Sequence, residues 1–167
     1  GNMKFRNGDS YSGAFLKGIR FGNGLYKWKS GAEYEGEWKD DEMEGTGRYS
    51  YSKNQYLRGT FEGNTFIDGE YYVKNDFGSY TFTIEEGEAT SIEMKLSDGT
   101  TYSGEMKNGK LSGSAQIKYS NGDKYEGNIK NGQKSGEGSY KWKSGASYTG
   151  SWKKDKLNGQ GSYKYAS

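Results

Sequence analysis

A short phrase of the form Tyr-x-Gly-x-aromatic recurs along the whole chain at an almost constant spacing of 22 or 23 residues. A fixed period of about 20–50 residues is typical of repeat arrays, in which no unit buries its apolar face alone and neighbouring units complete it. We therefore interpret the 167 residues as a single array, 1–167, of seven units, of which the third and fourth match the phrase poorly. The units begin near Tyr11, Tyr34, Leu57, Tyr80, Tyr102, Tyr125 and Tyr148.

Within each unit the glycines and rings stand two positions apart, as in the second phrase Gly22-x-Gly24-x-Tyr26-x-Trp28. Spacing of two places these residues on one face of a β-strand and polar residues on the other. Glycine at this density would destabilise a helix by about 1 kcal/mol at each interior position. The pattern predicts an all-β fold with two strands per unit: an elongated, single-layer antiparallel meander of up to fourteen strands, arranged as about seven tandem hairpins.

Turn residues such as those of 29–32 separate the two phrases and predict hairpin loops. Keeping the rings on one face then suggests a register in which rings lie over glycines of the next strand. This register pairs Trp28 with Tyr34, Tyr26 with Gly36, Gly24 with Trp38, Trp142 with Tyr148, Tyr140 with Gly150, and Gly138 with Trp152. On the polar face it sets Lys29 against Glu33 and Lys27 against Glu35. The terminal strands near Tyr11 and Tyr163 remain open edges.

The centre of the chain departs from the pattern. Between Phe61 and Tyr102 the glycines of the phrase give way to larger residues, among them Phe82, Ile92 and Met94. We expect a bulge or kink within 62–101, filled by aliphatic side chains.

Composition alone is ambiguous, because 30% apolar residues and a mean hydropathy of -1.14 are usual for disordered chains. The apolar content is concentrated in 16 Tyr, 7 Phe and 4 Trp, each able to cover about 150–250 Å². The absence of proline suits interior strands. Without cysteine or histidine the chain has no disulfides, thiolates, imidazole bases or common zinc ligands, so we expect no metal and no cofactor.

The sequence shows no apolar run of about 18 residues and no signal-peptide pattern, so we expect the chain as given to be soluble, in a compartment that it does not identify. Gly1 and Asn2 ahead of Met3 resemble a cloning remnant, and the last unit stops at or just after a strand at Tyr165. We therefore expect a piece of a longer protein.

The net charge of +2 is unevenly distributed. Residues 1–100 hold 12 basic and 17 acidic side chains, whereas residues 101–167 hold 12 and 5. The bias is explained either by a merely solvated face, or by head-to-tail association, or by a basic half that meets an anionic surface. Candidate contacts to such a surface are Lys130, Lys134, Lys141, Lys143, Lys153, Lys154 and Lys156.

The phrase resembles the MORN (membrane occupation and recognition nexus) repeat. The resemblance is carried by Tyr34-Glu-Gly36-Glu-Trp38, by the Gly45-Thr-Gly47 that follows, and by Tyr125-Glu-Gly127 after the turn 121–123. It covers nearly the whole chain and is most specific in units one, two, six and seven. It implies an array of hairpins that acts as a scaffold or docking module, associated with protein partners, self-association or acidic phospholipids, and without shared catalytic residues.

Enzyme signatures are weak. The spacing of Gly104, Gly109 and Lys110 imitates a phosphate-binding loop, but Leu111 stands where that motif needs Ser or Thr. The carboxylates of 33–44 lack EF-hand spacing and are expected in a solvated face or loop. We expect no catalysis.

The glycine-bearing face is the candidate surface, because large aromatic residues are favoured interface anchors. The alternative is that its rings only stack on one another. We expect a scaffold that binds a protein partner or self-associates; association with anionic lipid and binding of cell-wall or other glycans are the alternatives, and nothing favours nucleic acid. The candidate partner-binding rings are Tyr26, Trp28, Tyr34, Trp38, Tyr49, Tyr51, Tyr140, Trp142, Tyr148, Trp152 and Tyr163.

Overall fold

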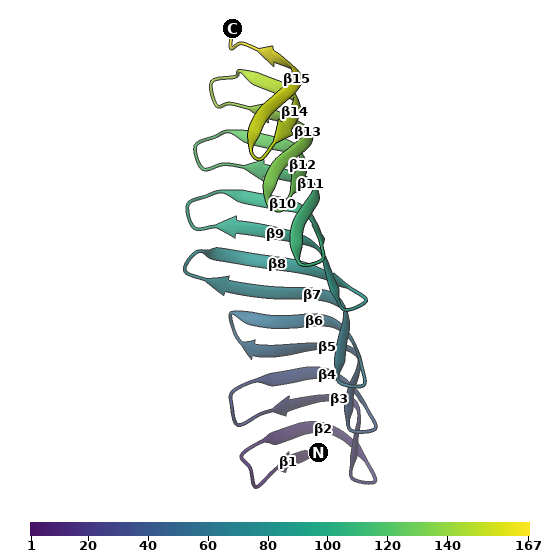
Figure 1. Ribbon diagram of the computed structural model, residues 1–167. Coiled ribbons are helices and arrows are strands. Elements are labelled where there is room, and N and C mark those ends of the chain that lie inside the picture. Colours follow the sequence, from purple (N-terminus) through teal and green to yellow (C-terminus); the bar gives the residue numbers. More distant parts are fainter. The chain divides into compact units, whose positions relative to one another are not determined.

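The protein is all-β, as expected: a computed structural model describes residues 1–167 and contains fifteen strands and no helix (Figure 1). Accordingly, it contains no helix long and apolar enough to cross a membrane. The strands are β1 (Asn2–Lys4), β2 (Ser10–Leu16), β3 (Ile19–Lys27), β4 (Glu33–Lys39), β5 (Glu42–Ser52), β6 (Gln55–Glu62), β7 (Thr65–Asn75), β8 (Gly78–Glu85), β9 (Glu88–Leu96), β10 (Thr101–Lys107), β11 (Lys110–Lys118), β12 (Lys124–Lys130), β13 (Gln133–Lys141), β14 (Ser147–Lys153) and β15 (Lys156–Lys164).

The strands lie in one open sheet in the order in which they occur in the sequence, from β1 to β15. Two compact units divide the chain, Gly1–Lys74 with Thr83–Glu88 and Asn75–Phe82 with Ala89–Ser167. The number of strands exceeds the expected fourteen because β1 precedes the first phrase. Tyr11 therefore lies in a strand paired on both sides, and β1 is the N-terminal edge. The other edge is β15, which carries Tyr163 as predicted.

Two kinds of turn alternate along the array. Two-residue turns join the strands within a repeat, and in these both central residues have positive φ, as at Asp40 (50°) and Asp41 (67°) or Asn131 (50°) and Gly132 (78°). Positive φ at both positions defines a type I′ turn, whose twist matches that of the flanking strands. Longer loops, such as the one between Trp28 and Ala32, join successive regular repeats, whereas only residues 53–54 and 76–77 separate the strands at the junctions β5–β6 and β7–β8.

These longer loops explain why the predicted register is wrong by two residues. The Trp28 N–H donates to the Ala32 carbonyl at 2.9 Å, and the Gly31 N–H donates to the Trp28 carbonyl at 3.0 Å. Gly31 adopts a φ of 99°, so three residues close the loop. Equivalent residues consequently face each other: Tyr26 opposes Tyr34, Gly24 opposes Gly36, Gly22 opposes Trp38, Tyr140 opposes Tyr148, Gly138 opposes Gly150, and Gly136 opposes Trp152.

The shifted register also changes the polar face. Lys27 opposes Glu33 and forms a 3.9 Å ion pair with it, while Glu35 lies opposite Leu25. The predicted pairs of Lys29 with Glu33 and of Lys27 with Glu35 are therefore wrong.

Bulges recur in the regular repeats rather than only at the centre. The register shifts between Gly36 and Trp38, and the facing Gly45 has a φ of 72°. Gly136 (73°) and Gly159 (73°) take the same conformation, which L-residues with a side chain rarely adopt. The first glycine of each Gly-x-Gly pair is thus required by the backbone.

Each unit has its own core. In the first, Tyr11, Tyr26, Tyr34, Trp38 and Phe61 form a buried aromatic cluster. In the second, a cluster of Ile92, Tyr102, Ala115 and Ile129 is flanked by Phe82 and Met94. The expected aliphatic filling is therefore present, and an irregularity in the β6–β7 register lies between Thr60 and Phe61.

Candidate docking surface

The first tyrosine of a repeat lies flat over glycine backbone. The Tyr11 hydroxyl donates to the carbonyl of Ala14, three residues further along its own strand, at 3.1 Å. A Cβ atom built on Gly24 would collide with this tyrosine ring, so only glycine fits there. The same bond joins Tyr34 to Glu37, Tyr125 to Asn128 and Tyr148 to Ser151, at 2.9, 2.7 and 3.0 Å. Rings do cover glycines, as expected, but they reach them along the strand and diagonally, not from the position directly opposite.

The tryptophan of the phrase completes this packing. Trp38 Nε1 donates to the Gly24 carbonyl at 3.1 Å, and its ring packs edge-on against Tyr34, with ring centroids 5.1 Å apart. Trp152 repeats the bond to Gly138 at 3.0 Å. Trp38 is only 5% exposed and Tyr34 is fully buried. Burial raises the pKa of Tyr34 to about 12.

Several predicted anchors are therefore enclosed by their neighbours. Tyr26, Tyr34, Trp38, Tyr148 and Trp152 are all buried. Replacing Trp38 or Trp152 would test the stability of the sheet more than the capture of a partner.

The remaining predicted rings are accessible and lie in two rows. Trp28, Tyr49, Tyr140 and Trp142 are half-buried, and Tyr51 and Tyr163 are each 47% exposed. The first ring row comprises Phe5, Tyr26, Trp28, Tyr49 and Tyr51, with successive centroids 5.8, 4.6, 5.1 and 4.9 Å apart. The second ring row comprises Tyr119, Tyr140, Trp142, Tyr163 and Tyr165, with separations of 5.8, 4.9, 5.5 and 4.8 Å.

A buried aspartate anchors each ring row to the turn of the preceding repeat. Asp9 accepts a 2.6 Å hydrogen bond from the Tyr26 hydroxyl and a 2.8 Å bond from the Lys29 N–H. The Tyr26 bond, followed by the Lys29 bond, lowers the pKa of the Asp9 carboxyl. Asp123 makes the same bonds to Tyr140 and the Lys143 N–H, with the same effect on its pKa.

A cation lies among the rings beside each ring row, a feature not predicted from the sequence. The Arg20 guanidinium carbon is 4.7 Å from the Trp38 ring centroid and 5.0 Å from that of Tyr26. Its Nε lies 3.1 Å from the Asp41 carboxylate. Such placement over ring faces is a cation–π arrangement.

Lys134 is the counterpart of Arg20. Its ammonium lies 5.5–5.7 Å from the centroids of Tyr119, Tyr125, Tyr140 and Trp152 and 3.6 Å from Asp155. The side chain is only 15% exposed. Both cations stand two positions after a two-residue turn and 21 residues before their aspartate, which is the signal that could have identified them.

The other candidate lysines fall into two groups at opposite ends of the strands. Lys130, Lys153, Lys154 and Lys156 surround the two-residue turns, whereas Lys141 and Lys143 adjoin the longer loop. A strand of nine residues spans about 30 Å. The lysines therefore form two separate groups rather than one continuous patch.

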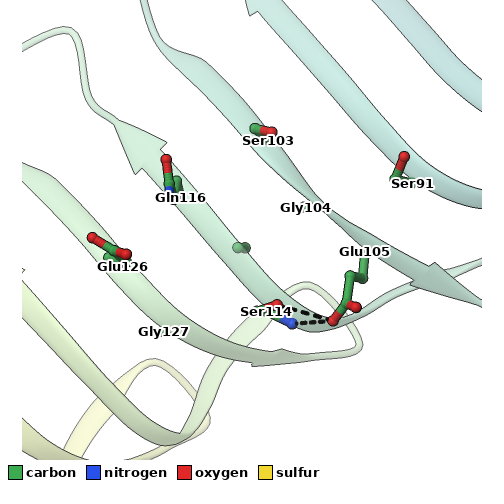
Figure 2. A pocket seen from close by; sticks show the side chains of 9 residues that line it. Ser91, Ser103, Gly104, Glu105, Ser114, Gln116, Glu126 and Gly127 are labelled. Carbon is green, nitrogen blue, oxygen red and sulfur yellow. Dashed lines mark hydrogen bonds between the residues drawn. The ribbon is translucent and has the colours of Figure 1, made fainter.

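Two hollows elsewhere on the sheet are lined by different kinds of side chain. A shallow hollow of about 540 Å³ lies over β9 to β12 and is lined by polar side chains such as Ser91, Ser103 and Gln116 and by no ring. Figure 2 shows these side chains. Within this hollow the Glu105 carboxylate accepts bonds from the Ser114 N–H at 2.6 Å and from the Ser114 hydroxyl at 3.0 Å. A second hollow, of about 230 Å³, adjoins the first ring row at Tyr26 and Trp28 and is also lined by Arg20, Asp41 and Met43.

An open sheet of tandem antiparallel hairpins, tied by tyrosines lying over glycines, defines a β-hairpin repeat protein. The family model described as the MORN repeat matches residues 11–33, 34–56, 102–124, 125–147 and 148–167. These segments make up more than half of the chain, which therefore belongs to the MORN repeat family. The two central repeats, which the sequence analysis found degenerate, lie outside the match.

Similar proteins carry the repeats within longer chains. MORN repeat-containing protein 3 of Xenopus laevis is 36% identical over 84 residues, which are 48% of this chain and 33% of that protein. Human alsin is 36% identical over 69 residues, 38% of this chain and 4% of alsin. Phosphatidylinositol 4-phosphate 5-kinase 1 of Oryza sativa subsp. japonica is 40% identical over 63 residues, which are 38% of this chain and 8% of that protein. The matched segment is a third or less of each relative.

Proposed function

We propose that this chain is a non-catalytic scaffold that binds a protein partner through its Gly/aromatic face. The observation that supports this most is the pair of ring rows, which include the accessible rings of Trp28, Tyr49, Tyr51, Trp142 and Tyr163. Trp and Tyr dominate binding energy at protein interfaces because they bury a large area at a small cost in side-chain entropy. A single-layer sheet leaves these rings available to a partner.

The rings of the first ring row are held in place by their neighbours, which favours the same function. Trp28 stacks between Tyr26 and Tyr49, and Tyr26 is fixed by its bond to Asp9. A preorganised surface loses less conformational entropy when a partner binds.

Partner capture tests this function. The protein would be immobilised and its partner identified from cells, after which affinity would be measured for Trp28→Ala, Tyr51→Ala and the control Phe21→Ala. Phe21 is 41% exposed but lies on the opposite face of β3. We expect the first two changes to weaken binding by tenfold or more, since interface anchors contribute about 2 kcal/mol or more, and Phe21→Ala to leave it unchanged. Equal affinity of all variants, with unaltered circular dichroism, would exclude the ring rows as the docking surface.

Self-association through the open edges is the second mode within this function. The strands β1 and β15 each have one unpaired side, and unpaired strand edges pair readily with other strands. Light scattering coupled to size exclusion, over a hundredfold range of concentration, measures it directly. A constant monomer mass would remove this mode.

Association with an anionic membrane surface is an alternative function. The excess of lysines in 101–167 favours it, and one similar protein is a phosphatidylinositol 4-phosphate 5-kinase by name. Sedimentation with phosphatidylserine vesicles should then be strong at low salt and weak at physiological salt. No sedimentation at low salt would exclude it.

A further inference from the structure

We propose that the polar face of the second compact unit binds a linear inorganic polyphosphate through a row of five lysines. This lysine row crosses the sheet from β9 to β15, near the strand ends that adjoin the longer loops, and comprises Lys95, Lys118, Lys124, Lys141 and Lys164. Its members alternate along their strands with ring-face residues such as Tyr125 and Tyr140 and therefore point to the opposite face. The inference goes beyond the proposed function and does not depend on it.

The pairing of the strands places these lysines in one line. Residues paired directly across a sheet point to the same face and are close neighbours. Neighbouring strands lie about 4.8 Å apart, so a line from β9 to β15 is about 29 Å long. The residues paired along this line are, in order, Lys95, Thr101, Lys118, Lys124, Lys141, Ser147 and Lys164.

The positive charge of the lysine row is not neutralised within the protein. All five lysines are exposed, and none forms an ion pair, although the chain contains four ion pairs elsewhere. Like charges directly opposite each other destabilise a sheet. The pairing of Lys124 with Lys118 on one side and with Lys141 on the other is therefore unfavourable until an anion lies over it.

The first compact unit has a less basic row at the equivalent place. The two units resemble each other at an offset of 114 residues, as Trp28 and Trp142 illustrate. Glu33 of the first unit pairs at 3.9 Å with Lys27, the counterpart of Lys141. The hairpin fold therefore does not require an unneutralised row of lysines. The first-unit counterparts of Lys124, Ser147 and Lys164 are Ser10, Glu33 and Ser50.

Two further hollows follow the lysine row. One of about 370 Å³ is lined by Lys118, Lys124 and Lys141, and one of about 190 Å³ by Lys95 and Lys118. Hydroxyl and amide groups beside the cations can donate hydrogen bonds to phosphate oxygens. Lysines outnumber carboxylates in both hollows. The other polar side chains include Gln116, Ser139, Thr149, Thr101 and Ser103, and the single carboxylates are Glu126 and Glu93; Figure 2 shows Ser103, Gln116 and Glu126 on neighbouring strands.

The chemistry of this face favours a phosphate chain over other linear polyanions. Over β10 to β15 its side chains are Ser, Thr, Asn, Gln, Lys and Glu, without a ring or an aliphatic group. Single-stranded nucleic acid is held largely by stacking of bases on rings, and peptides by large anchors. An extended peptide also places same-side carboxylates about 6.6 Å apart, wider than the strand spacing. Polyphosphate carries a charge at every link and needs only cations and hydrogen-bond donors.

Calorimetric titration of the full chain with medium-chain polyphosphate tests the site. The row variant, Lys124→Ser/Ser147→Glu/Lys164→Ser, introduces the three residues of the first unit and lowers the net charge by three. We expect it to weaken binding about tenfold or more, because fewer counterions are released. Lys124→Ser alone, which changes one exposed side chain, should have a smaller effect in the same direction.

A matched control separates the lysine row from net charge. The control variant, Lys107→Ser/Lys110→Ser/Gln133→Glu, lowers the charge equally at exposed positions beside the two-residue turns. Lys107 and Lys110 are also paired directly, so the control includes a like-charge pair. These positions lie six or more residues further along their strands, about 20 Å from the row. The control should change the affinity by less than about threefold, since it keeps the local cations that contact phosphate.

Thermal melts distinguish loss of binding from loss of folding. Since the row variant relieves like-charge pairs, its Tm should equal or exceed that of the unaltered chain. A ligand that binds only the folded chain raises its Tm. Polyphosphate should therefore raise the Tm of the unaltered chain and of the control variant, and raise that of the row variant less.

Two kinds of result would overturn the proposal. One is no binding of polyphosphate at low salt, or equal losses in the row and control variants. The other is tighter binding of oligodeoxythymidine, polyglutamate, heparin or phosphatidylserine vesicles than of polyphosphate, lost in the row variant, which would assign the row to that ligand. Trp28→Ala should leave polyphosphate binding unchanged, so this proposal and the proposed function can fail separately; weaker binding by Trp28→Ala would contradict the assignment to the polar face.

Discussion

The Tyr102 hydroxyl is buried without a hydrogen-bond partner, and Ala115 stands where four other repeats place a glycine. A Cβ built on Gly104 would lie 2.9 Å from the Ala115 methyl and 3.0 Å from the Tyr102 ring. The methyl group occupies the space into which the equivalent Tyr125 extends to reach the Asn128 carbonyl. The fifth repeat therefore lacks the bond that the other matched repeats form.

This difference predicts opposite effects of the same substitution. Tyr125→Phe removes a hydrogen bond and should lower the free energy of unfolding by about 1 kcal/mol. Tyr102→Phe removes a buried hydroxyl that has no partner, so stability should stay equal or rise. Urea unfolding of both variants measures this, and equal losses would contradict the role assigned to Ala115.

The bond between Asp9 and Tyr26 predicts a second contrast. Tyr49 is equivalent to Tyr26 one repeat later, but Ala32 occupies the place of Asp9 there. Tyr26→Phe should lower Tm by about 2–4 °C, the shift that the loss of one hydrogen bond causes in a chain of this size. Tyr49→Phe should leave Tm nearly unchanged. If the Tm of Tyr49→Phe were equal to or lower than that of Tyr26→Phe, the stabilising role assigned to Asp9 would be contradicted.

Acid should destabilise the protein through its turn aspartates. Hydrogen bonds lower the pKa of Asp9 and Asp123 in the folded state, so the unfolded chain binds protons at higher pH than the folded one does. Stability is therefore complete well above the unfolded value of about 3.9, and it decreases as pH falls towards the lower folded values. Asp98 and Glu105 shift in the same direction. Thermal melts at several pH values between 6 and 2 measure how strongly Tm depends on pH. This dependence should be weaker for Asp9→Asn/Asp123→Asn than for the unaltered chain, and an equal dependence would contradict this assignment.

Alkali should act through the buried tyrosines. Burial raises the pKa of Tyr34 and of Tyr125 to about 12, above the usual 10.0. Between these values the unfolded chain loses the proton while the folded chain keeps it, so stability falls as pH rises above 10. Denaturation by urea at pH 9 and pH 11 measures the loss. Tyr163, which is exposed, provides the control: Tyr34→Phe should reduce the pH dependence, and Tyr163→Phe should not.

The fold was predictable because parity in a strand depends only on spacing. Alternate placement of glycine and rings specified strands, and a constant period specified an open array, before any contact was known. Register was not predictable by the same route, because it depends on how Gly31 closes the loop after Trp28. A φ of 99° at one residue shortened the loop and moved every pair by two positions.

The candidate surface was predictable in its location but not in its extent. Spacing identified the face that carries Tyr34 and Trp38, but it could not reveal that these rings bury each other. Nor could it show that Lys134 lies in an aromatic cluster with its charge paired to Asp155, since that depends on contacts between neighbouring repeats.

The central claim, that a partner docks on the accessible rings of the two ring rows, is tested most directly with the four tryptophans of the chain. Trp28 and Trp142 belong to the rows and are half-buried, whereas Trp38 and Trp152 are buried in the packing. The full chain, labelled with 5-fluorotryptophan so that each tryptophan gives its own fluorine NMR resonance, would be titrated with the captured partner. We predict that the partner shifts the resonances of Trp28 and Trp142 and leaves those of Trp38 and Trp152 unchanged. Bound partner with unchanged resonances of Trp28 and Trp142 would contradict the claim.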